Sequence, residues 1–356
     1  MKYKNLGKTQ TKVSEICLGT MTFGEQNSEE ESVKQMNFAF NKGVNFFDTA
    51  EIYPIYPRKE THGNTEKIIG NWLKEKKNRD KIILASKIAS GHTKGTGATG
   101  LSWIRGGRKN LKFDKKNFNE AINDSLKRLQ TDYIDLYQLH WPERNVAVFG
   151  QLDFEYDESD IDWTPIQEVL ENLNELVKSG KIRHFGLSNE TPWGIIKFLQ
   201  TAKENKLPEI VSVQNGYNLV NRVFDIANSE VSIREQCGLL AYSPMAGGRL
   251  SGKYIGGKRP ENARYTLWPK RFSRHNTERG ELAISKYYEI AKKYNISLST
   301  LANAFVLSRP FVTSSIVGAT SVYQLEENIN STNLKLSEEI LKEVNDIHLL
   351  DPNPCV

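Results

Sequence analysis

Short apolar segments alternate with amphipathic stretches along almost the whole chain. The apolar segments do not alternate strictly with polar residues, which is typical of strands that are buried on both faces of a parallel sheet. The amphipathic stretches between them have the spacing of helices that cover such a sheet. The candidate strands span residues 16–18, 44–47, 82–85, 133–139, 184–187, 210–213, 239–242 and 315–317. Eight buried strands separated by helices predict a (β/α)8 TIM barrel, with an open, doubly wound parallel sheet as the alternative.

Several helix ends are marked by capping residues. Two capping boxes, in which Ser or Thr is followed three residues later by Gln, predict helix starts at Thr164 and Ser321. Gly180 predicts the end of the first of these helices, and Ser337 predicts the start of a C-terminal helix. No linker rich in Pro or Ser divides the chain, so we expect a single barrel domain over residues 1–356.

Three connections exceed the usual length of loops between strand and helix: residues 88–113, 140–163 and 243–276. Each follows a predicted strand. Each should therefore form a long loop on the C-terminal face of the barrel, where barrel enzymes build their sites.

Two glycine-rich segments imitate nucleotide-binding motifs. Residues 95–100 fit G-x-G-x-x-G, but no strand leads directly into them, so we interpret them as a rim loop. Residues 247–253 nearly fit a phosphate-binding loop, but Tyr254 stands where a Ser or Thr would bind magnesium. We expect neither a Rossmann domain nor an ATPase, although the second segment is suited to wrapping a phosphate.

Composition narrows the class of protein. The charge of +5 comes from 48 basic and 43 acidic residues that are scattered along the chain, so we expect no nucleic-acid partner. Three cysteines without a C-x-x-C pair predict neither a disulfide framework nor a metal site. No signal peptide and no apolar run of about 18 residues are recognisable, so we expect a cytoplasmic protein without a membrane partner.

Four polar residues stand at or just beyond the ends of successive predicted strands: Asp48, Tyr53, Lys87 and His140. On a barrel these positions converge on one rim. A tyrosine with its ordinary pKa of about 10 is a poor proton donor at neutral pH, so we expect the Lys87 ammonium to lower the Tyr53 pKa. Asp48 would hold Lys87 in place, and His140 would donate a hydrogen bond to a carbonyl oxygen. The group is suited to polarising and protonating a carbonyl.

The motifs around these residues resemble the aldo-keto reductase family, and the resemblance covers nearly the whole chain. The matching segments are residues 19–24, 47–53, 86–87, 139–141, 186–189, 214, 241–244, 318–320 and 324–328. The resemblance implies a barrel that binds NADP(H) without a Rossmann motif and reduces a small aldehyde or ketone by hydride transfer. It assigns Tyr53 as general acid, Lys87 and Asp48 as the residues that tune it, and His140 as the residue that orients the carbonyl.

The resemblance also implies a cofactor site. Its residues are Gly19, Thr20, Met21, Asp48, Ser188, Asn189, Gln214, Tyr242, Ser243, Pro244, Met245, Gly247, Leu250, Lys253, Arg264, Gly318, Thr320, Gln324, Glu327 and Asn328. Ser188, Asn189 and Gln214 have polar groups that can hold the carboxamide. Many relatives carry an arginine for the 2′-phosphate just after the last strand. This chain has none there, so we expect Lys253 and Arg264 to replace it.

Tyr242 is suited to stacking on the nicotinamide ring. We expect the substrate beside Tyr53 and His140, with Trp141 and Trp103 as apolar walls. The sequence does not identify the carbonyl compound.

Two other functions also fit the sequence. Potassium-channel β-subunits resemble this chain as well, so an NADP(H)-binding sensor with little turnover is one alternative. A barrel epimerase or lyase that uses Tyr53 and His140 without a cofactor is the other. Steady turnover of aldehydes would argue against the sensor, and NADPH binding would argue against the epimerase. We expect a monomer.

Overall fold

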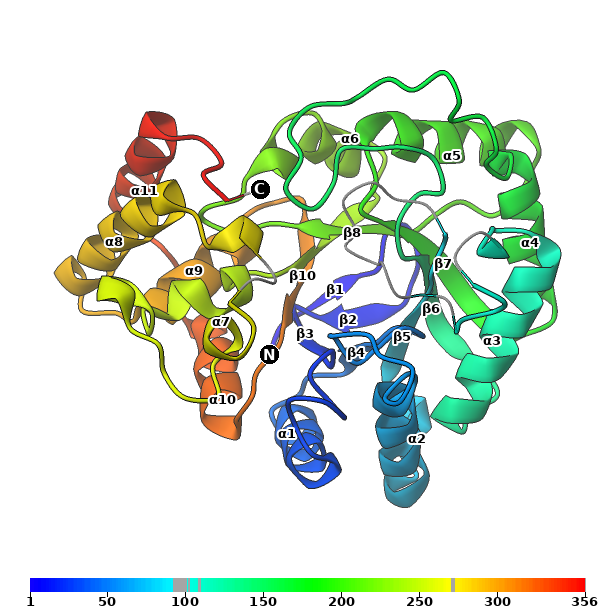
Figure 1. The fold of residues 1–356 in the computed structure, drawn as a ribbon, viewed down its shortest axis with the longest axis horizontal. Coiled ribbons are helices and arrows are strands. Elements are labelled where there is room, and N and C mark those ends of the chain that lie inside the picture. The colour runs from blue at the N-terminus through cyan, green and yellow to red at the C-terminus, as the bar shows by residue number, and fades with distance from the viewer. Residues whose placement is uncertain (92–100, 102, 108–109, 270–272, 356) are drawn as a thin grey trace.

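Eight parallel strands form a closed barrel, and helices surround it (Figure 1). The computed structural model describes residues 1–91, 101, 103–107, 110–269 and 273–355. The barrel strands are β3 (Ile16–Gly19), β4 (Phe46–Asp48), β5 (Ile83–Ile88), β6 (Ile134–Leu139), β7 (Ile182–Ser188), β8 (Ser212–Gly216), β9 (Gly238–Tyr242) and β10 (Val312–Val317). Each strand pairs with the next, and β10 pairs with β3. The predicted (β/α)8 barrel is confirmed, and an open sheet is excluded.

The outer layer of the barrel is helical. Its helices are α1 (Glu29–Asn41), α2 (Asn64–Lys76), α3 (Lys115–Leu129), α4 (Ile166–Lys178), α5 (Pro192–Glu204), α6 (Asn228–Arg234), α8 (Glu278–Lys293), α9 (Leu298–Leu307), α10 (Val322–Asn330) and α11 (Glu338–Leu350). The short helix α7 (Arg264–Leu267) belongs to the insertion after β9. None of the helices in the described part of the chain is both long and apolar enough to cross a bilayer.

Helix α4 begins differently from the sequence prediction. Its N-cap is Pro165, which has no side-chain donor or acceptor, so the capping box predicted at Thr164 is wrong. The Thr164 backbone amide instead donates to Glu143 Oε2 at 2.7 Å. This contact fixes Thr164 one residue before the cap. The predicted end is confirmed, because Gly180 follows the last turn with a positive φ of 74°.

Helices α10 and α11 begin where the sequence predicts. The Ser321 and Ser337 side chains accept hydrogen bonds from the backbone amides of Gln324 and Ile340. The Gln324 carboxamide does not complete a capping box, because its oxygen accepts from the Thr320 backbone amide at 3.0 Å. Residues after the last strand are therefore tied to the start of α10.

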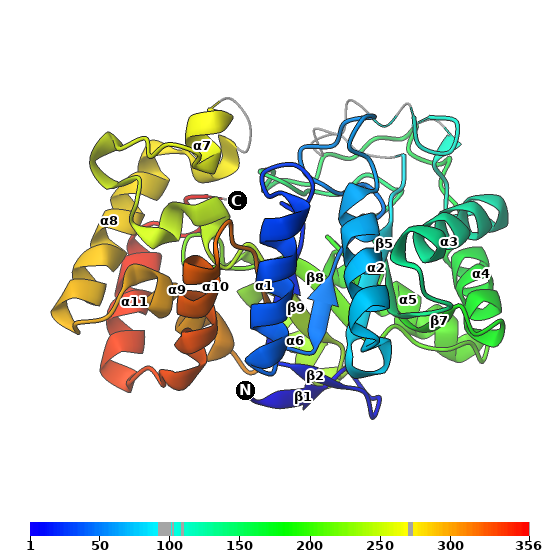
Figure 2. The same ribbon diagram turned by 90° about the horizontal axis from the view of Figure 1, so that it is seen from below.

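A hairpin that the sequence analysis missed closes one end of the barrel. It consists of β1 (Tyr3–Asn5) and β2 (Lys12–Ser14), which pair antiparallel. The side chains of Leu6 and Val13 are fully buried in the same cluster as residues from inside the barrel, such as Phe46. Figure 2 shows the hairpin at one end of the molecule and α7 at the other. The hairpin therefore plugs the N-terminal end and leaves the C-terminal end for the site.

The three predicted insertions follow β5, β6 and β9, so they start at the C-terminal ends of barrel strands. The G-x-G-x-x-G segment at residues 95–100 lies outside the described residues. The near phosphate-loop segment forms short 3-10 turns, in which Gly247 has a φ of 66° and a Cβ would lie 2.5 Å from Tyr265 Oη. Only glycine fits that position without moving the tyrosine.

A buried ion pair fastens the β6 insertion to the end of β7. The two terminal guanidinium nitrogens of Arg144, Nη1 and Nη2, donate to the carboxylate of Glu190, whose side chain is only 3% exposed. The Glu190 carboxylate also accepts from the Thr191 backbone amide at 2.7 Å. Arg144 lies over the Trp193 ring, 4.8 Å from its centroid. The pair therefore joins two of the segments that surround the C-terminal rim.

We expect Arg144→Met to lower the free energy of unfolding by about 3 kcal/mol, because it leaves Glu190 buried without a counter-charge. Urea denaturation of the two proteins measures this difference. The double variant Arg144→Met/Glu190→Gln should recover part of the loss. Lys34→Met, which breaks an exposed ion pair with Glu30, is the matched control and should leave the unfolding midpoint unchanged. Equal midpoints for Arg144→Met and wild type would contradict the prediction.

Candidate active site

Lys87 is the centre of the polar group at the C-terminal rim. Its ammonium donates to Asp48 Oδ2 at 2.6 Å, to the Thr49 carbonyl oxygen at 2.8 Å and to Tyr53 Oη at 3.4 Å. Asp48 pairs in register with Ala85, and Lys87 follows two residues later on the same, inward face of β5. Lys87 is completely buried. Strand register therefore brings together the acid, the ammonium and the phenol that the sequence predicts.

Two glutamines complete the environment of Asp48. The side-chain amides of Gln214 and Gln138 donate to Asp48 Oδ1 at 2.9 and 3.2 Å. Gln214 also donates to Gln138 Oε1 at 3.1 Å. The sequence analysis did not include Gln138, although a glutamine within an apolar strand was an available signal. Asp48 is thus held on both oxygens, one by the ammonium and one by amides.

The charge states of Lys87 and Tyr53 follow from burial and from each other. Burial lowers the pKa of Lys87, but Asp48 and Tyr53 together outweigh it and raise the pKa above its ordinary value. Burial raises the pKa of Tyr53, and Lys87 offsets only part of this effect. Lys87 lowers the pKa of Tyr53, as the sequence predicts, but burial, with a further contribution from Asp48, outweighs this effect, so the pKa stays above its ordinary value. At pH 7 Tyr53 is therefore a neutral phenol beside the Lys87 ammonium.

His140 lies beside Tyr53, just beyond the end of β6. The two rings cross nearly at right angles with centroids 5.9 Å apart, and the Trp141 ring is 4.5 Å from the His140 ring. Burial, with a smaller effect of Lys87, holds the pKa of His140 well below its ordinary value, so the imidazole is neutral at pH 7. Its Nδ1 has no hydrogen-bond partner among the described residues. A neutral imidazole here can donate one hydrogen bond to a ligand.

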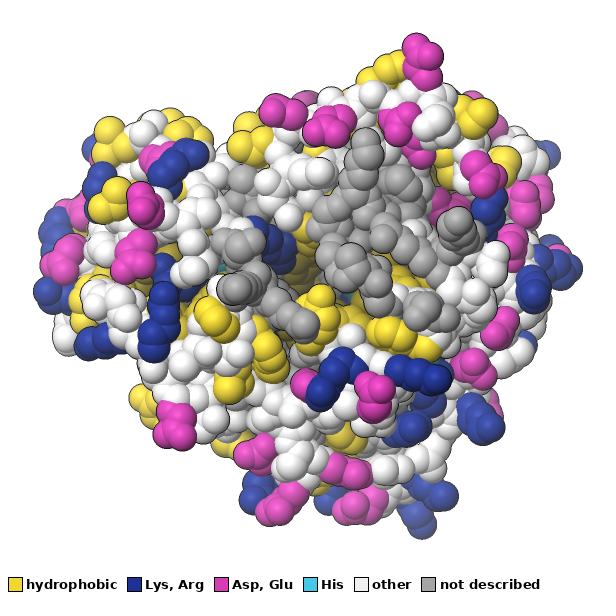
Figure 3. All heavy atoms as spheres, viewed as in Figure 1, with side chains coloured by type: hydrophobic (Ala, Val, Ile, Leu, Met, Phe, Trp, Pro, Cys, Tyr) yellow, Lys and Arg dark blue, Asp and Glu magenta, His cyan; other side chains and the backbone are white. Residues whose placement is uncertain are grey.

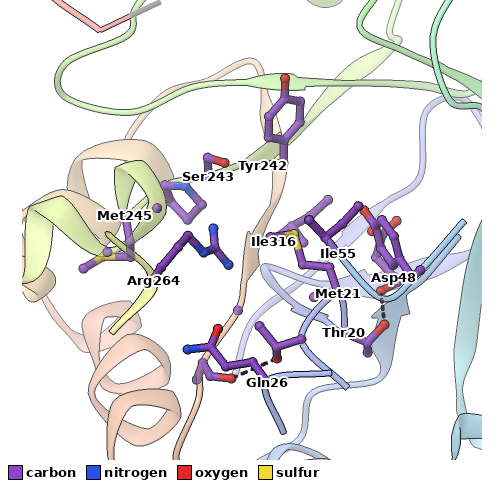
Figure 4. Close-up of a pocket in the computed structure, with 18 of the residues that line it drawn as sticks. Thr20, Met21, Gln26, Asp48, Ile55, Tyr242, Ser243, Met245, Arg264 and Ile316 are labelled. Carbon is purple, nitrogen blue, oxygen red and sulfur yellow. Dashed lines mark hydrogen bonds between the residues drawn. The ribbon is translucent and has the colours of Figure 1, made fainter. Parts of the chain in front are cut away.

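These residues lie at a cavity of about 640 Å³. Figure 3 shows the hollow, with hydrophobic side chains in it and basic side chains at its edge. Of the predicted site residues, the cavity is lined by Gly19, Thr20, Met21, Asp48, Tyr53, His140, Trp141, Ser188, Asn189, Gln214, Tyr242, Ser243, Pro244, Met245, Gly247, Lys253, Arg264, Gly318, Thr320, Gln324, Glu327 and Asn328. In Figure 4, Arg264 extends into the space between Met245 and Ile316.

Three predicted site residues do not line the cavity. Lys87 is completely buried and reaches the cavity only through its contacts with Asp48 and Tyr53. Leu250 is fully buried in the hydrophobic core, in one cluster with Ala246. Trp103 is partly buried against the cluster that contains Trp141, away from the cavity surface. The structure therefore brings together all but these three at the wall.

The cavity has polar groups suited to a dinucleotide. Asn189 Nδ2 donates to the His140 carbonyl oxygen at 2.8 Å, and Tyr242 Oη donates to Asn189 Oδ1 at 2.7 Å. Farther along, burial lowers the pKa of Lys253, and the nearby charge of Arg264 lowers it further. Two cations that crowd each other in a partly buried place favour an anion such as a phosphate. The residues present therefore fit the predicted cofactor.

The sequence analysis missed several residues that the fold brings to the cavity wall. They are Thr22, Gln26, Ile52, Ile55, Tyr56, Pro57, Leu101, Gly248, Ser251, Tyr265, Arg274, His275, Ser299, Ile316 and Ala319. Gln26 reaches across to the β9 insertion and donates to the Asn262 carbonyl oxygen at 2.9 Å. Most of these residues have no signal in the sequence, because loops decide their position. Within the described ranges, no three metal-ligating side chains cluster.

Comparison with known proteins agrees with this geometry. The sequence model of the Aldo/keto reductase family matches residues 15–348. Protein tas of Escherichia coli strain K12 is 43% identical over the full length of both chains. An aldo-keto reductase of Babesia bovis is 38% identical over 75% of this chain and 96% of its own. An uncharacterized oxidoreductase, YrpG of Bacillus subtilis strain 168, is 32% identical over 98% and 96% of the two chains. This chain is therefore an oxidoreductase that belongs to the aldo/keto reductase family.

Proposed function

We propose that this protein is an NADP(H)-dependent reductase that converts an aldehyde or ketone to an alcohol, with Tyr53 as the proton donor. The observation that carries the proposal is the buried contact of Lys87 with Tyr53, 3.4 Å between nitrogen and oxygen, at a cavity large enough for a cofactor and a small substrate. Family membership supports it.

Four side chains have separate roles in the proposed reaction. NADPH, when bound, supplies hydride to the carbonyl carbon. Tyr53 Oη gives its proton to the carbonyl oxygen as negative charge develops there. The Lys87 ammonium stabilises the phenolate that remains, and Asp48 keeps that ammonium charged and in place. The neutral His140 donates a hydrogen bond to the same carbonyl oxygen and orients it.

The cofactor would lie along the cavity from β7 to α10. Ser188, Asn189 and Gln214 would hold the carboxamide, and Tyr242 would stack on the nicotinamide ring. The turns that contain Gly247 would follow the diphosphate. The cations Lys253 and Arg264 would bind the 2′-phosphate, while Gln324, Glu327 and Asn328 would face the adenosine. All of these side chains and turns line the same cavity.

We expect NADPH to bind at least tenfold more tightly than NADH. This ratio corresponds to about 1.4 kcal/mol, a modest value for one charge-assisted contact to a phosphate. Fluorescence titration measures both dissociation constants. Lys253→Met should weaken NADPH binding more than NADH binding, and Lys258→Met, an exposed lysine of the same insertion, is the control. Equal constants for the two cofactors in wild type would contradict the prediction, and an equal loss in Lys253→Met would assign Lys253 to the diphosphate.

Steady-state oxidation of NADPH with 4-nitrobenzaldehyde tests the function itself. Repeated turnover with formation of the alcohol supports a reductase. Tight NADPH binding with negligible turnover would instead favour the sensor that the sequence left open. Absence of NADPH binding would contradict both.

The cysteines support a reducing compartment, which we propose to be the cytoplasm. Cys17, Cys237 and Cys355 are free and buried. Burial raises the pKa of Cys237 to about 12, so this thiol is protonated and unreactive at pH 7. Fractionation of the expressing cells, with immunodetection of the protein, tests the location.

A further inference from the structure

Arg274 lies on the cavity wall without a counter-charge. It belongs to the 3-10 turn Ser273–His275 at the end of the β9 insertion. Its guanidinium carbon is 5.3 Å from the centroid of the Phe149 ring and 5.7 Å from that of the Tyr242 ring. Among the described residues, no carboxylate lies within ion-pair distance of it. Arg274 therefore bridges the β6 and β9 insertions by stacking alone.

Basic side chains outnumber carboxylates in the cavity wall. Three basic side chains line it, namely Lys253, Arg264 and Arg274, whereas its lining carboxylates are Asp48 and Glu327. The Asp48 carboxylate is already engaged by the Lys87 ammonium. Burial lowers the pKa of Arg264, and the charge of Arg274 lowers it further, so these like charges repel each other. Such a set of charges is stabilised when an anion enters the cavity.

His275, the next residue, is a second feature that points to a ligand-binding site. It lines the cavity, is only 3% exposed, and has no hydrogen-bond partner on either ring nitrogen among the described residues. An unpaired buried polar group is costly, so a molecule that supplies a partner gains affinity. Burial, helped by Arg274, holds the pKa of His275 well below its ordinary value. The positive charge of this turn therefore comes from Arg274.

Arg274 lies near the catalytic end of the cavity. Arg274 contacts the ring of Tyr242. The Tyr242 hydroxyl donates to the Asn189 side chain, and the Asn189 side-chain amide donates to the His140 carbonyl oxygen. Phe149, the other ring that Arg274 contacts, belongs to the insertion that starts at His140. Arg274 thus contacts the Tyr242 ring, and two hydrogen bonds join Tyr242 through Asn189 to the backbone of His140. Lys253 and Arg264 line the same cavity and are the residues proposed above for the cofactor 2′-phosphate.

We propose that Arg274 determines specificity by binding an anionic group, such as a carboxylate, on the carbonyl substrate. The substrate class is then an aldehyde or ketone with an acidic substituent, whose apolar part lies against Phe149. A guanidinium in contact with two aromatic rings has restricted freedom, so it loses little more when a carboxylate binds. This inference rests on the proposed reductase function, because it assigns the substrate of the same site.

A pair of aldehydes that share one ring and differ in charge tests the proposal. One is 4-carboxybenzaldehyde, and the other is its neutral methyl ester. Wild type should reduce the carboxylate with a kcat/KM about 10- to 100-fold higher, the range for a charge-assisted hydrogen bond. Arg274→Gln should lose this preference mainly through KM, because its kcat/KM with the carboxylate falls toward its kcat/KM with the ester. Arg259→Gln, which removes an exposed charge from the same insertion, should keep the preference.

Two further measurements separate the possible failures. The NADPH dissociation constant of Arg274→Gln should equal that of wild type. If it rises while the ratio of the two aldehydes stays constant, Arg274 serves the cofactor and the proposal is overturned. If wild type reduces neither aldehyde, the reductase function fails. Binding of benzoate against benzamide to the NADP⁺ complex then tests the anion site alone, and equal affinities in wild type and Arg274→Gln overturn it.

Discussion

Tyr53→Phe should reduce aldehydes about 10²- to 10⁴-fold more slowly than wild type in a single turnover, the range that general acid catalysis typically contributes. The variant keeps the ring and removes only the hydroxyl that lies 3.4 Å from the Lys87 ammonium. Packing and NADPH binding should therefore survive. Stopped-flow oxidation of bound NADPH by 4-nitrobenzaldehyde measures the chemical step without product release.

The control for this variant is Tyr56→Phe. Tyr56 belongs to the same loop and lines the same cavity, so the change removes a second hydroxyl from the site. It should retain most of the wild-type rate. A Tyr53→Phe variant that binds NADPH normally and reduces the aldehyde at nearly the wild-type rate would overturn the assignment of the proton donor.

The dependence of the single-turnover rate on pH should also show that Tyr53 is the proton donor. Reduction requires the protonated phenol, and burial raises the pKa of Tyr53 above the ordinary value of 10.0. The rate should therefore stay constant from neutral to alkaline pH and fall only above about pH 10, where the phenol ionises. His140 adds no change in this range, because its pKa lies well below 6.5 and the imidazole is already neutral.

Lys87→Met should be equally severe, with the single-turnover rate lowered at least about 10²-fold. Burial already raises the pKa of Tyr53, and the Lys87 charge is the main influence that opposes it. Without the ammonium the phenol becomes a weaker acid, and no positive charge stabilises the phenolate. Asp48, which is 2% exposed, also loses its ion-pair partner. We therefore expect a loss of about 3–5 kcal/mol in the free energy of unfolding.

A second substitution separates the two effects of this change. Lys87→Met/Asp48→Asn removes the unpaired carboxylate, while the neutral amide can still contact Gln138 and Gln214. Urea denaturation should show recovered stability, whereas the stopped-flow rate should remain low. Recovery of the rate together with the stability would mean that Lys87 matters only for folding. The catalytic role would then be lost.

The pattern of the sequence determined the barrel and the position of the polar group at its C-terminal rim. Strands that are buried on both faces need continuous apolar segments, and such segments are visible locally. Asp48, Lys87 and His140 stand at or just beyond the ends of three such segments. Parallel strands direct their ends to one rim, so linear positions sufficed to predict that these side chains meet.

Tertiary structure decided what depends on neighbours from distant segments. The pKa of Tyr53 is raised because total burial, with a further contribution from Asp48, outweighs the Lys87 charge. The cap of α4 was displaced by Glu143, a residue of the preceding insertion. Arg274 reached the cavity through the packing of two long insertions against each other. Burial, competition for backbone amides and loop packing each depend on residues from many parts of the fold. A local sequence pattern therefore does not predict them.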